Sequence, residues 1–306
     1  MLSRIAESLF WIGRYVERAD DTSRILDVQT QLMLEDPGLG VPAACRAVLS
    51  IMGVEAPPGD LTVAQLVDLL AYDPASPESI AASLHAARES ARRARETLSE
   101  PLWVTINTTH RAIGSGAFRS MQTSRGLRWV RDQAALISGT ADATMTRDEG
   151  WQFFMLGKSI ERADMTARLL ASAALSPGHV WTTTLRACGA HEAFLRSRRG
   201  LETDREVVGF LLLDQLFPGS VSYSINRAER CLNILEASVH RDGADNDARR
   251  VLGRARSDLE YRSISDLVDD LPLAMDEFQL ACAQATDAIT RRFFSGSEAL
   301  EWHGTR

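Results

Sequence analysis

Apolar side chains recur at helical spacing along nearly the whole chain. Near the start, one narrow sector of a helix with about 100° per residue collects five side chains, Ile5, Leu9, Ile12, Val16 and Ser23. No long stretch alternates with a period of two, which is the pattern typical of a half-buried strand. Segments rich in Pro and Gly divide the chain into about ten predicted helices. The pattern therefore predicts an all-α protein, a multi-helix bundle.

Two helix starts can be predicted from local chemistry. Ser76-Pro77-Glu78 offers a capping Ser followed by Pro, which is favoured at the first helical position. Thr146 stands three residues before Glu149, the spacing of a capping box, with acids where the helix dipole favours them. We therefore expect one helix to begin directly after Ser76 and another directly after Thr146.

A second stripe of residues lies beside the apolar sector of the first predicted helix. It contains Gly13, Glu17, Asp20 and Arg24, spaced i, i+4, i+7 and i+11. Asp20 and Arg24 are one turn apart and can form an ion pair. Because Gly13 has no side chain, another backbone can approach the helix there. Two interpretations remain open: the stripe faces solvent, or it is buried inside a larger bundle.

The segment that carries this stripe occurs twice. Residues 9–26 recur 144 positions later as residues 153–170, with Gly, Glu, Arg, Ala, Asp, Thr and Arg identical in register. The apolar positions are also retained. We therefore predict two related helical halves, residues 1–144 and 145–306, with a pseudo-two-fold repeat of the charged helix. No long flexible linker separates the halves, which favours a single domain over residues 1–306.

The repeated charges admit three interpretations. Glu17 and Glu161 are candidates for a buried ion network at the interface of the two repeats, where removal of one partner leaves a costly lone charge. Alternatively, both carboxylates line a cleft and perform acid–base catalysis while Arg clamps an anionic substrate. A third hypothesis is a partner-binding surface. The residues of the predicted binding or structural ion network are Arg18, Asp20, Arg24, Arg162, Asp164 and Arg168.

Composition narrows the class of protein. The chain has 306 residues, of which 25% are charged and 45% hydrophobic, and its formal net charge is −7. These values exclude general disorder, and the acidic balance argues against a nucleic-acid-binding protein. No apolar run reaches the roughly 18–20 residues that a membrane helix needs. Residues 1–10 do not resemble a signal peptide. We therefore expect a cytoplasmic protein without a membrane partner.

No metal or cofactor signature is present in the sequence. The four cysteines are far apart and form no CxxC pair, and the six histidines show no HExxH or HxxxH spacing. Phosphate-binding loops, nucleophile elbows and dinucleotide fingerprints are also absent. We therefore predict no cofactor and no metal site from neighbouring ligands, while ligands gathered from distant helices stay open.

An arginine-rich stretch is a further candidate site. Residues 84–131 contain nine Arg and only three acids. Arg88, Arg92 and Arg95 lie close together and are followed by Trp103 and Asn107. One interpretation is a surface that binds an anion or a partner, and the other is a solvated helix face. The general preference for Arg, 33 of the 34 basic residues, is best explained by the codon usage of a GC-rich genome.

An ordered set of motifs resembles the bacterial alpha-E domain family, which is named for an ER motif. The motifs extend over nearly the whole chain: Met1-Leu2-Ser3-Arg4, residues 14–19, Ala87-Arg88-Glu89-Ser90-Ala91-Arg92, Trp103 with Asn107, Asp148-Glu149-Gly150-Trp151, Glu161-Arg162-Ala163, Leu211-Leu212-Leu213-Asp214, Phe217-Pro218, Ser220-Val221 and Phe293-Phe294. The resemblance implies an α-helical domain. It supplies no established catalytic residue.

The resemblance also implies a set of partners. Such proteins are typically encoded beside a circularly permuted ATP-grasp ligase and a transglutaminase-like peptidase, a context of peptide ligation. We therefore expect a helical companion or scaffold protein of an ATP-grasp amide ligase that is not itself catalytic. Two alternatives remain open. One is an enzyme with a Glu/Arg site between the repeats, acting on a peptide or other anionic substrate, and the other is a purely structural homo-oligomer.

Overall fold

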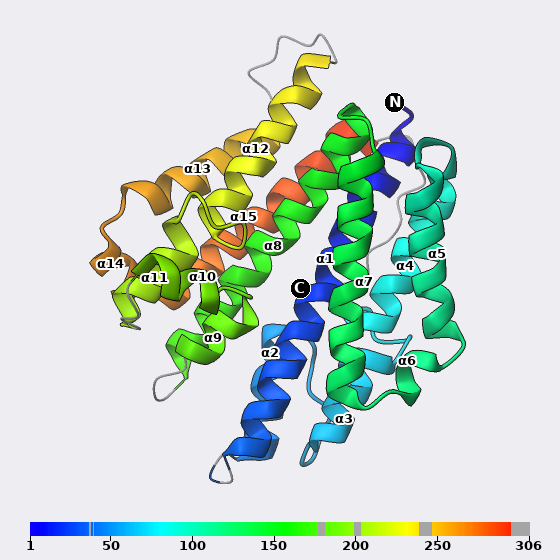
Figure 1. Cartoon of the computed structure of the whole chain (residues 1–306). Helices are drawn as coiled ribbons and strands as arrows, with labels where there is room; N and C mark the ends of the chain where they lie inside the picture. The colour runs from blue at the N-terminus through cyan, green and yellow to red at the C-terminus, as the bar shows by residue number, and fades with distance from the viewer. Residues whose placement is uncertain (37, 39, 177–180, 199–202, 239–246, 295–306) are drawn as a thin grey trace. The chain divides into compact units, whose positions relative to one another are not determined.

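A computed structural model describes residues 1–36, 38, 40–176, 181–198, 203–238 and 247–294. These ranges contain fifteen α-helices and no strand, so the predicted all-α fold is confirmed (Figure 1). Seven α-helices precede residue 145: α1 (Ser3–Glu35), α2 (Val41–Ile51), α3 (Val63–Val67), α4 (Ile80–Arg93), α5 (Glu100–Gly114), α6 (Ala117–Ser120) and α7 (Thr123–Thr144).

Eight α-helices follow: α8 (Glu149–Leu175), α9 (Trp181–Ala187), α10 (His191–Arg198), α11 (Asp204–Leu213), α12 (Val221–Ser238), α13 (Asp247–Tyr261), α14 (Ile264–Asp269) and α15 (Leu271–Ile289). Short π or 3-10 turns cover Asp68–Tyr72, Arg95–Thr97 and Thr290–Phe294. The estimate of about ten helices was too low, because helices of four to eight residues show too little periodicity to be recognised.

The chain divides into two compact units, and their boundary falls inside α1. The carboxy-terminal unit contains Met1–Arg14 and the described residues from Arg147 onward, and the amino-terminal unit contains Tyr15–Thr146. The first turns of α1 thus pack with residues of the second predicted half.

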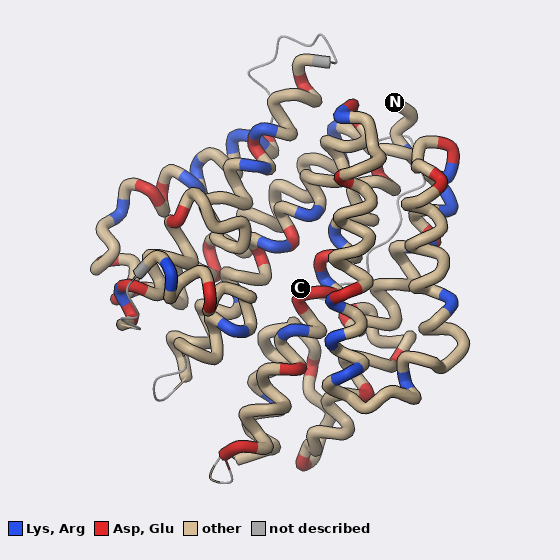
Figure 2. Tube along the Cα trace, viewed as in Figure 1, with Lys and Arg blue, Asp and Glu red and all other residues tan. Residues whose placement is uncertain are grey.

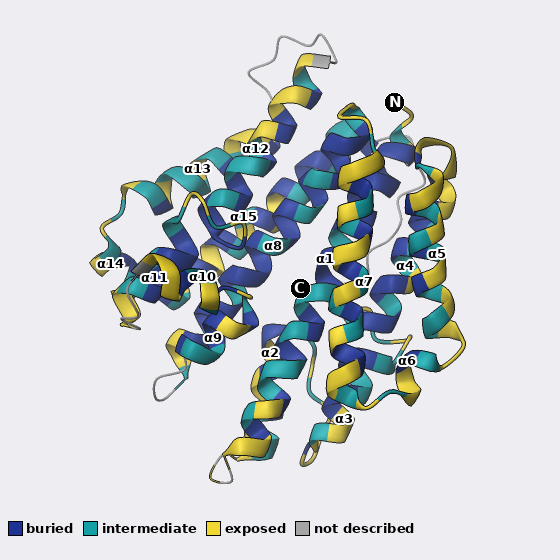
Figure 3. Cartoon of the chain, in the orientation of Figure 1, coloured by how far each residue is buried: buried dark blue, intermediate teal, exposed yellow. Residues whose placement is uncertain are grey.

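The carboxy-terminal unit is organised around α8. This helix is buried along most of its length (Figure 3) and packs against α12 and α15. Its aromatic core includes the Phe10 ring, 5.6 Å from that of Phe294, which is itself 5.8 Å from the Phe153 ring. A helix that is apolar or close-packed all round belongs in the interior of a bundle, which explains the central position of α8.

The amino-terminal unit contains the later turns of α1 together with α2–α7. Here α5 packs against both α4 and α7. Arg131 on α7 donates to Asp27 on α1 at 2.8 Å, so an ion pair joins these two helices. The predicted apolar sector of α1 is confirmed on both sides of the unit boundary, because Leu9 and Ile12 in the carboxy-terminal unit and Ser23 in the amino-terminal unit are all buried.

Both predicted helix starts were wrong by a few residues. Helix α4 begins at Ile80, because the Ser79 hydroxyl accepts from the backbone N–H of Ala82 at 3.0 Å and acts as the N-cap. Helix α8 is capped by Asp148, which accepts from the backbone N–H of Trp151 at 3.3 Å. In each case a side chain nearer the apolar run satisfies the helix N–H groups.

The same local hydrogen bonds recur at positions 141 residues apart. Thr62 caps α3 and Thr203 caps α11 through identical bonds to the third helical residue. The Ser79 hydroxyl donates to the carbonyl of Asp73, and that of Ser220 donates to the carbonyl of Asp214. The sequence correspondence thus extends beyond the charged helices, into segments that periodicity alone did not align.

Left-handed glycines end two further helices in the same way. Gly53 has φ 70° and follows α2, and Gly189 has φ 63° and follows α9. In both turns the residue after the glycine donates its N–H to a carbonyl five residues earlier, Val54 to Leu49 and Ala190 to Leu185. This helix ending needs a positive φ, which glycine adopts without steric cost.

Candidate functional site

Gly13 and Gly157 bring the backbones of α1 and α8 into direct contact. A Cβ atom at Gly13 would lie 2.1 Å from the carbonyl oxygen of Phe154, and one at Gly157 would lie 2.0 Å from that of Phe10. The two contacts are equivalent in the repeat: Phe10 and Phe154 occupy matching positions of the two copies, as do Gly13 and Gly157, so each glycine meets the phenylalanine of the other copy. The predicted close approach at Gly13 is confirmed, and the approaching backbone is that of the second repeat copy.

Glu161 forms a buried ion pair beside this crossing. Its side chain is 3% exposed, and its Oε2 accepts from Arg14 Nε at 2.5 Å. Arg14 also donates from Nη1 to the hydroxyl of Thr286 at 3.2 Å, and its guanidinium lies 5.4 Å from the ring centroid of Trp11. The guanidinium is thus held by a carboxylate, a hydroxyl and an aromatic face.

Sequence reasoning did not include Arg14 among the candidate site residues. The predicted partners of Glu161 were Arg24, Arg168 or arginines of other helices. The observed partner, Arg14, is an arginine of another helix and lies about one turn before Glu17, the glutamate of the other copy. The available signal was a basic residue in the same register in both copies, Arg14 and Lys158.

The remaining charges of the second copy lie along α8. Arg168 donates from Nε to Asp164 at 2.8 Å, the predicted i,i+4 type of pair, and Arg162 is half-buried. Asp164 and Arg168 both act on the buried thiol of Cys282 on α15. Burial, reinforced by Asp164, raises the pKa of that thiol well above its ordinary value. Since the thiolate is the nucleophilic form, Cys282 is unsuited to nucleophilic catalysis.

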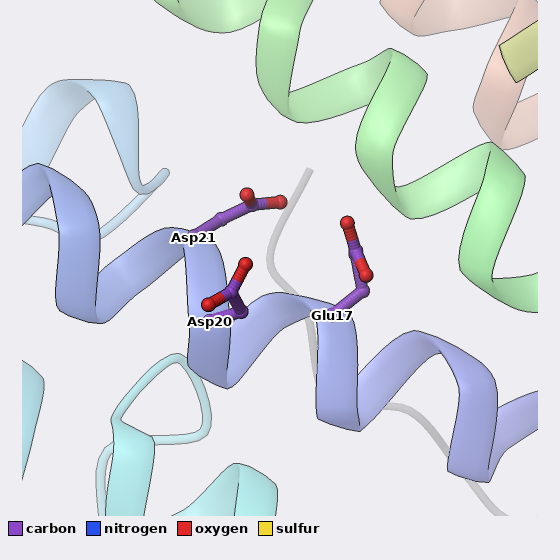
Figure 4. Close-up of side chains that lie close together, drawn as sticks. All are labelled: Glu17, Asp20 and Asp21. Atoms are coloured by element: carbon purple, nitrogen blue, oxygen red, sulfur yellow. The ribbon is translucent and has the colours of Figure 1, made fainter. Parts of the chain in front are cut away.

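The first copy gathers three carboxylates instead. Oxygen atoms of Glu17, Asp20 and Asp21 lie within 4.8 Å of one another on α1 (Figure 4). Glu17 is buried, and Arg24 donates to Asp20 at 2.7 Å as the spacing predicted. Burial by itself would lower the pKa of Arg24. The nearby carboxylates outweigh burial, so the pKa of Arg24 is raised by Asp20, Asp21 and Glu17. Carboxylate oxygens suit Mg²⁺ or Ca²⁺, while Arg24 already offsets part of their charge.

Arg18, the arginine of the first ER dipeptide, is buried in the amino-terminal unit. Its Nη1 lies 3.2 Å from Oε2 of Glu78, just before α4, and its side chain is 5% exposed. In the second copy the position equivalent to Glu78 is Gly219, whose carbonyl accepts from the Thr166 hydroxyl at 3.0 Å. A glycine therefore stands in the second copy where the first copy has the acidic partner of Arg18.

The threonines of the motif provide a matched pair of substitutions. Thr22 is fully buried and its hydroxyl has no hydrogen-bond partner among the described residues, whereas the Thr166 hydroxyl is bonded. We expect Thr166→Val to lower the free energy of unfolding by about 1–3 kcal/mol, because the carbonyl of Gly219 loses its donor. Thr22→Val should raise it by about 1 kcal/mol, since an unsatisfied hydroxyl is replaced by a methyl group. Urea unfolding measures both, and changes of the same sign would contradict the assignment.

Part of the arginine-rich stretch forms one cluster on α4, the 3-10 turn that follows it and α5. The guanidinium groups of Arg88 and Arg95 lie 5.8 and 5.4 Å from the ring centroid of Trp103. Glu89 binds Arg88, and Arg92 donates to it from Nε at 3.0 Å. Burial by itself would raise the pKa of Glu89, but hydrogen bonds from both arginines outweigh burial and lower it. Trp103, which follows the arginines in the sequence, thus lies beside two of them in the structure, and Glu89 neutralises part of their charge.

Charged residues of both signs are found on most of the longer described helices (Figure 2), whereas α15 contains only acidic ones. The buried charges are concentrated on the repeated segments of α1 and α8, where Glu17, Arg18, Glu161 and Asp164 are each less than 9% exposed. Among the described helices, none has both the length and the apolar character that crossing a membrane requires.

These features define a class of helical domain in which a charged ER helix is built into the protein interior. Residues 1–294 match the Alpha-E family, described as a predicted alpha-helical domain with a conserved ER motif, and the chain belongs to that family. The resemblance seen in the sequence is thereby confirmed.

The curated relatives are mycobacterial. Uncharacterised proteins of Mycobacterium bovis and of two strains of Mycobacterium tuberculosis are each 26% identical to this chain over 265 residues. The similarity covers 77% of this chain but only 30% of each relative. This chain therefore spans less than a third of the length of those relatives. No solved structure shows significant similarity to it.

Proposed function

We propose that this protein is a non-catalytic helical companion of an ATP-grasp amide ligase. The observation that carries the proposal is that the curated relatives contain this domain as 30% of a much longer chain, joined to other parts. A domain that relatives carry covalently joined to other parts of their chains is expected to act together with those parts. The ligase as partner, and a transglutaminase-like peptidase as a second one, follow from the family resemblance.

The state of the motif glutamates supports a non-catalytic role. Glu161 is almost fully buried and its carboxylate is engaged by Arg14. A general acid or base must reach the proton it transfers, directly or through one water. A carboxylate held in an ion pair inside a packed bundle stabilises the fold instead. We place this companion in the cytoplasm, where the ligase finds its ATP.

We further propose that residues 1–144 and 145–306 are two copies of one helical unit with pseudo-two-fold symmetry. The reciprocal contacts at Gly13 and Gly157 support this, because a two-fold operation exchanges each contact with the other. The repeated caps at Thr62 and Thr203 also support it.

Co-expression with the neighbouring ligase tests the companion role. We expect an affinity-tagged copy of this chain to retain the ligase through gel filtration, and addition of the chain to raise the rate of ATP-dependent amide formation. A matched pair of variants sharpens the experiment: Arg92→Glu alters the exposed arginine cluster, and Arg250→Glu alters an equally exposed position on α13. Absence of a complex together with an unchanged ligase rate would overturn the proposal. Self-association alone would favour the structural homo-oligomer.

The acidic cluster favours one alternative function, an enzyme that acts on a peptide or other anionic substrate. Glu17, Asp20 and Asp21 converge, although position 165, equivalent to Asp21, is Met. In this alternative Glu17 acts as acid or base beside Arg24. Glu17→Gln would then abolish turnover while leaving the free energy of unfolding nearly unchanged.

A further inference from the structure

Two histidines from different helices face each other in the amino-terminal unit. Nδ1 of His85 on α4 lies 3.1 Å from Nε2 of His110 on α5, and the ring centroids are 5.2 Å apart. Twenty-five residues separate them in the chain, so no local spacing rule identifies the pair. Their approach results from the packing of α4 against α5.

The distance between the two nitrogens matches the separation of two imidazole ligands bound to one metal ion. Two imidazole nitrogens bound to one ion at about 2.0–2.1 Å, with an angle between about 90° and 109°, lie about 2.8–3.4 Å apart. The 3.1 Å separation of His85 and His110 falls within this range. We infer that His85 and His110 form a site for a divalent transition-metal ion that favours imidazole, such as Zn²⁺ or Ni²⁺.

The hydrogen bond between the neutral rings keeps this arrangement in the absence of an ion. One ring then donates to the other across the same 3.1 Å. When a metal ion binds both facing nitrogens, the proton of the donor ring moves to the other nitrogen of that ring, and each neutral ring then presents a lone pair to the ion. The two nitrogens already lie 3.1 Å apart, so the site is preorganised.

The neighbouring charges accommodate a cation. Two charged residues of α4, Arg88 and Glu89, act on His110 in opposite directions. The Arg88 guanidinium binds Glu89, donates to Oδ1 of Asn107 at 3.4 Å and lies over the Trp103 ring, so part of its charge is offset. Glu89 follows His85 by one helical turn, so its carboxylate adds negative charge on the same face of α4.

The two histidines supply only two of the ligands that the metal ion needs. No third His, Cys, Asp or Glu of the described chain completes a metal-binding group with the two histidines. His85 is exposed, so water or a group from outside the chain can occupy the other coordination positions. Ions that accept a mixed set of imidazole and water ligands therefore suit the site better than Ca²⁺ or Mg²⁺, which prefer oxygen ligands throughout.

Titration of the untagged full chain with Zn²⁺ after removal of metals by EDTA tests the inference. Isothermal titration calorimetry should detect one ion per chain at this site, and His85→Gln or His110→Gln should each weaken the binding by about tenfold or more. His191→Gln on α10 is the matched control and should leave the affinity unchanged, since that residue lies in the other unit.

Two further measurements keep the result interpretable. Circular dichroism should show that both variants keep the helical content of the parent, because neither His85 nor His110 is a buried core residue. Co²⁺ in place of Zn²⁺ should give visible absorption bands that disappear in the double variant. Zn²⁺ binding that survives in the His85→Gln/His110→Gln double variant, or absence of Zn²⁺ binding to the parent, overturns the inference. Neither result depends on whether the ligase complex forms.

Discussion

Gly157→Ala is expected to lower the free energy of unfolding by about 3 kcal/mol or more, or to prevent folding. The added methyl group would lie 2.0 Å from the carbonyl oxygen of Phe10, so α1 and α8 must move apart. The obstacle is the backbone of a helix, which cannot rotate away as a flexible side chain does. Gly13→Ala meets the equivalent carbonyl, that of Phe154, at 2.1 Å and should have a similar effect.

The expected destabilisation by Gly157→Ala runs against the intrinsic helix propensities of the two residues. Ala in a helix interior is more favourable than Gly by about 0.5–1 kcal/mol. Gly139→Ala in α7 is therefore the matched control, because nothing lies within 4 Å of its added Cβ and the position is exposed. We expect Gly139→Ala to stabilise the protein by about that amount.

Urea unfolding followed by circular dichroism measures all three variants. If Gly157→Ala and Gly139→Ala change the free energy of unfolding by the same amount, the two helices do not cross at these glycines. Retained stability in Gly13→Ala alone would place the contact on one side only, and would contradict the reciprocal packing.

Glu161→Gln is expected to cost about 3 kcal/mol of stability, because the guanidinium of Arg14 remains buried without its counter-charge. Arg14→Met should cost about 3–5 kcal/mol, since it leaves a buried carboxylate unpaired. The distinction from a catalytic glutamate is direct: a group kept for catalysis can be neutralised with little loss of stability.

A double-mutant cycle isolates the contribution of the pair. Replacing both charges, in Arg14→Met with Glu161→Met, removes the uncompensated charge and should recover most of the stability lost in either single variant. Glu192→Gln on α10 is the control, because its side chain is 83% exposed. Additive losses in the double variant would mean that Arg14 and Glu161 stabilise the fold independently of each other.

Much of the local structure followed from the order of residues. The spacing of Leu9, Ile12 and Val16 predicted the buried face of α1, and the i,i+4 pairs Asp20–Arg24 and Asp164–Arg168 formed as expected. These features depend on the 3.6-residue period of a single helix, so neighbouring residues are sufficient to specify them. Helix starts were less predictable, because several capping side chains competed within a few residues before α4 and α8.

Contacts between helices could not be predicted from the sequence in the same way. The sequence showed that Gly13 allows a close approach, but not that the backbone at Phe154 fills that space. It likewise aligned Arg14 with Lys158 without showing that Arg14 binds Glu161. Each of these contacts joins residues more than 140 positions apart, and their distance is set by the crossing of two helices.

The sequence by itself determined the helical class, the duplication of the ER segment and the positions of its charges, because helical periodicity and register are local properties. Only the tertiary structure decided that the second glutamate is buried against Arg14, that three carboxylates of the first copy converge, and that His85 meets His110. The physical reason is that burial and charge pairing depend on which helix faces which. That arrangement is selected by the packing of the whole core, not by any one segment.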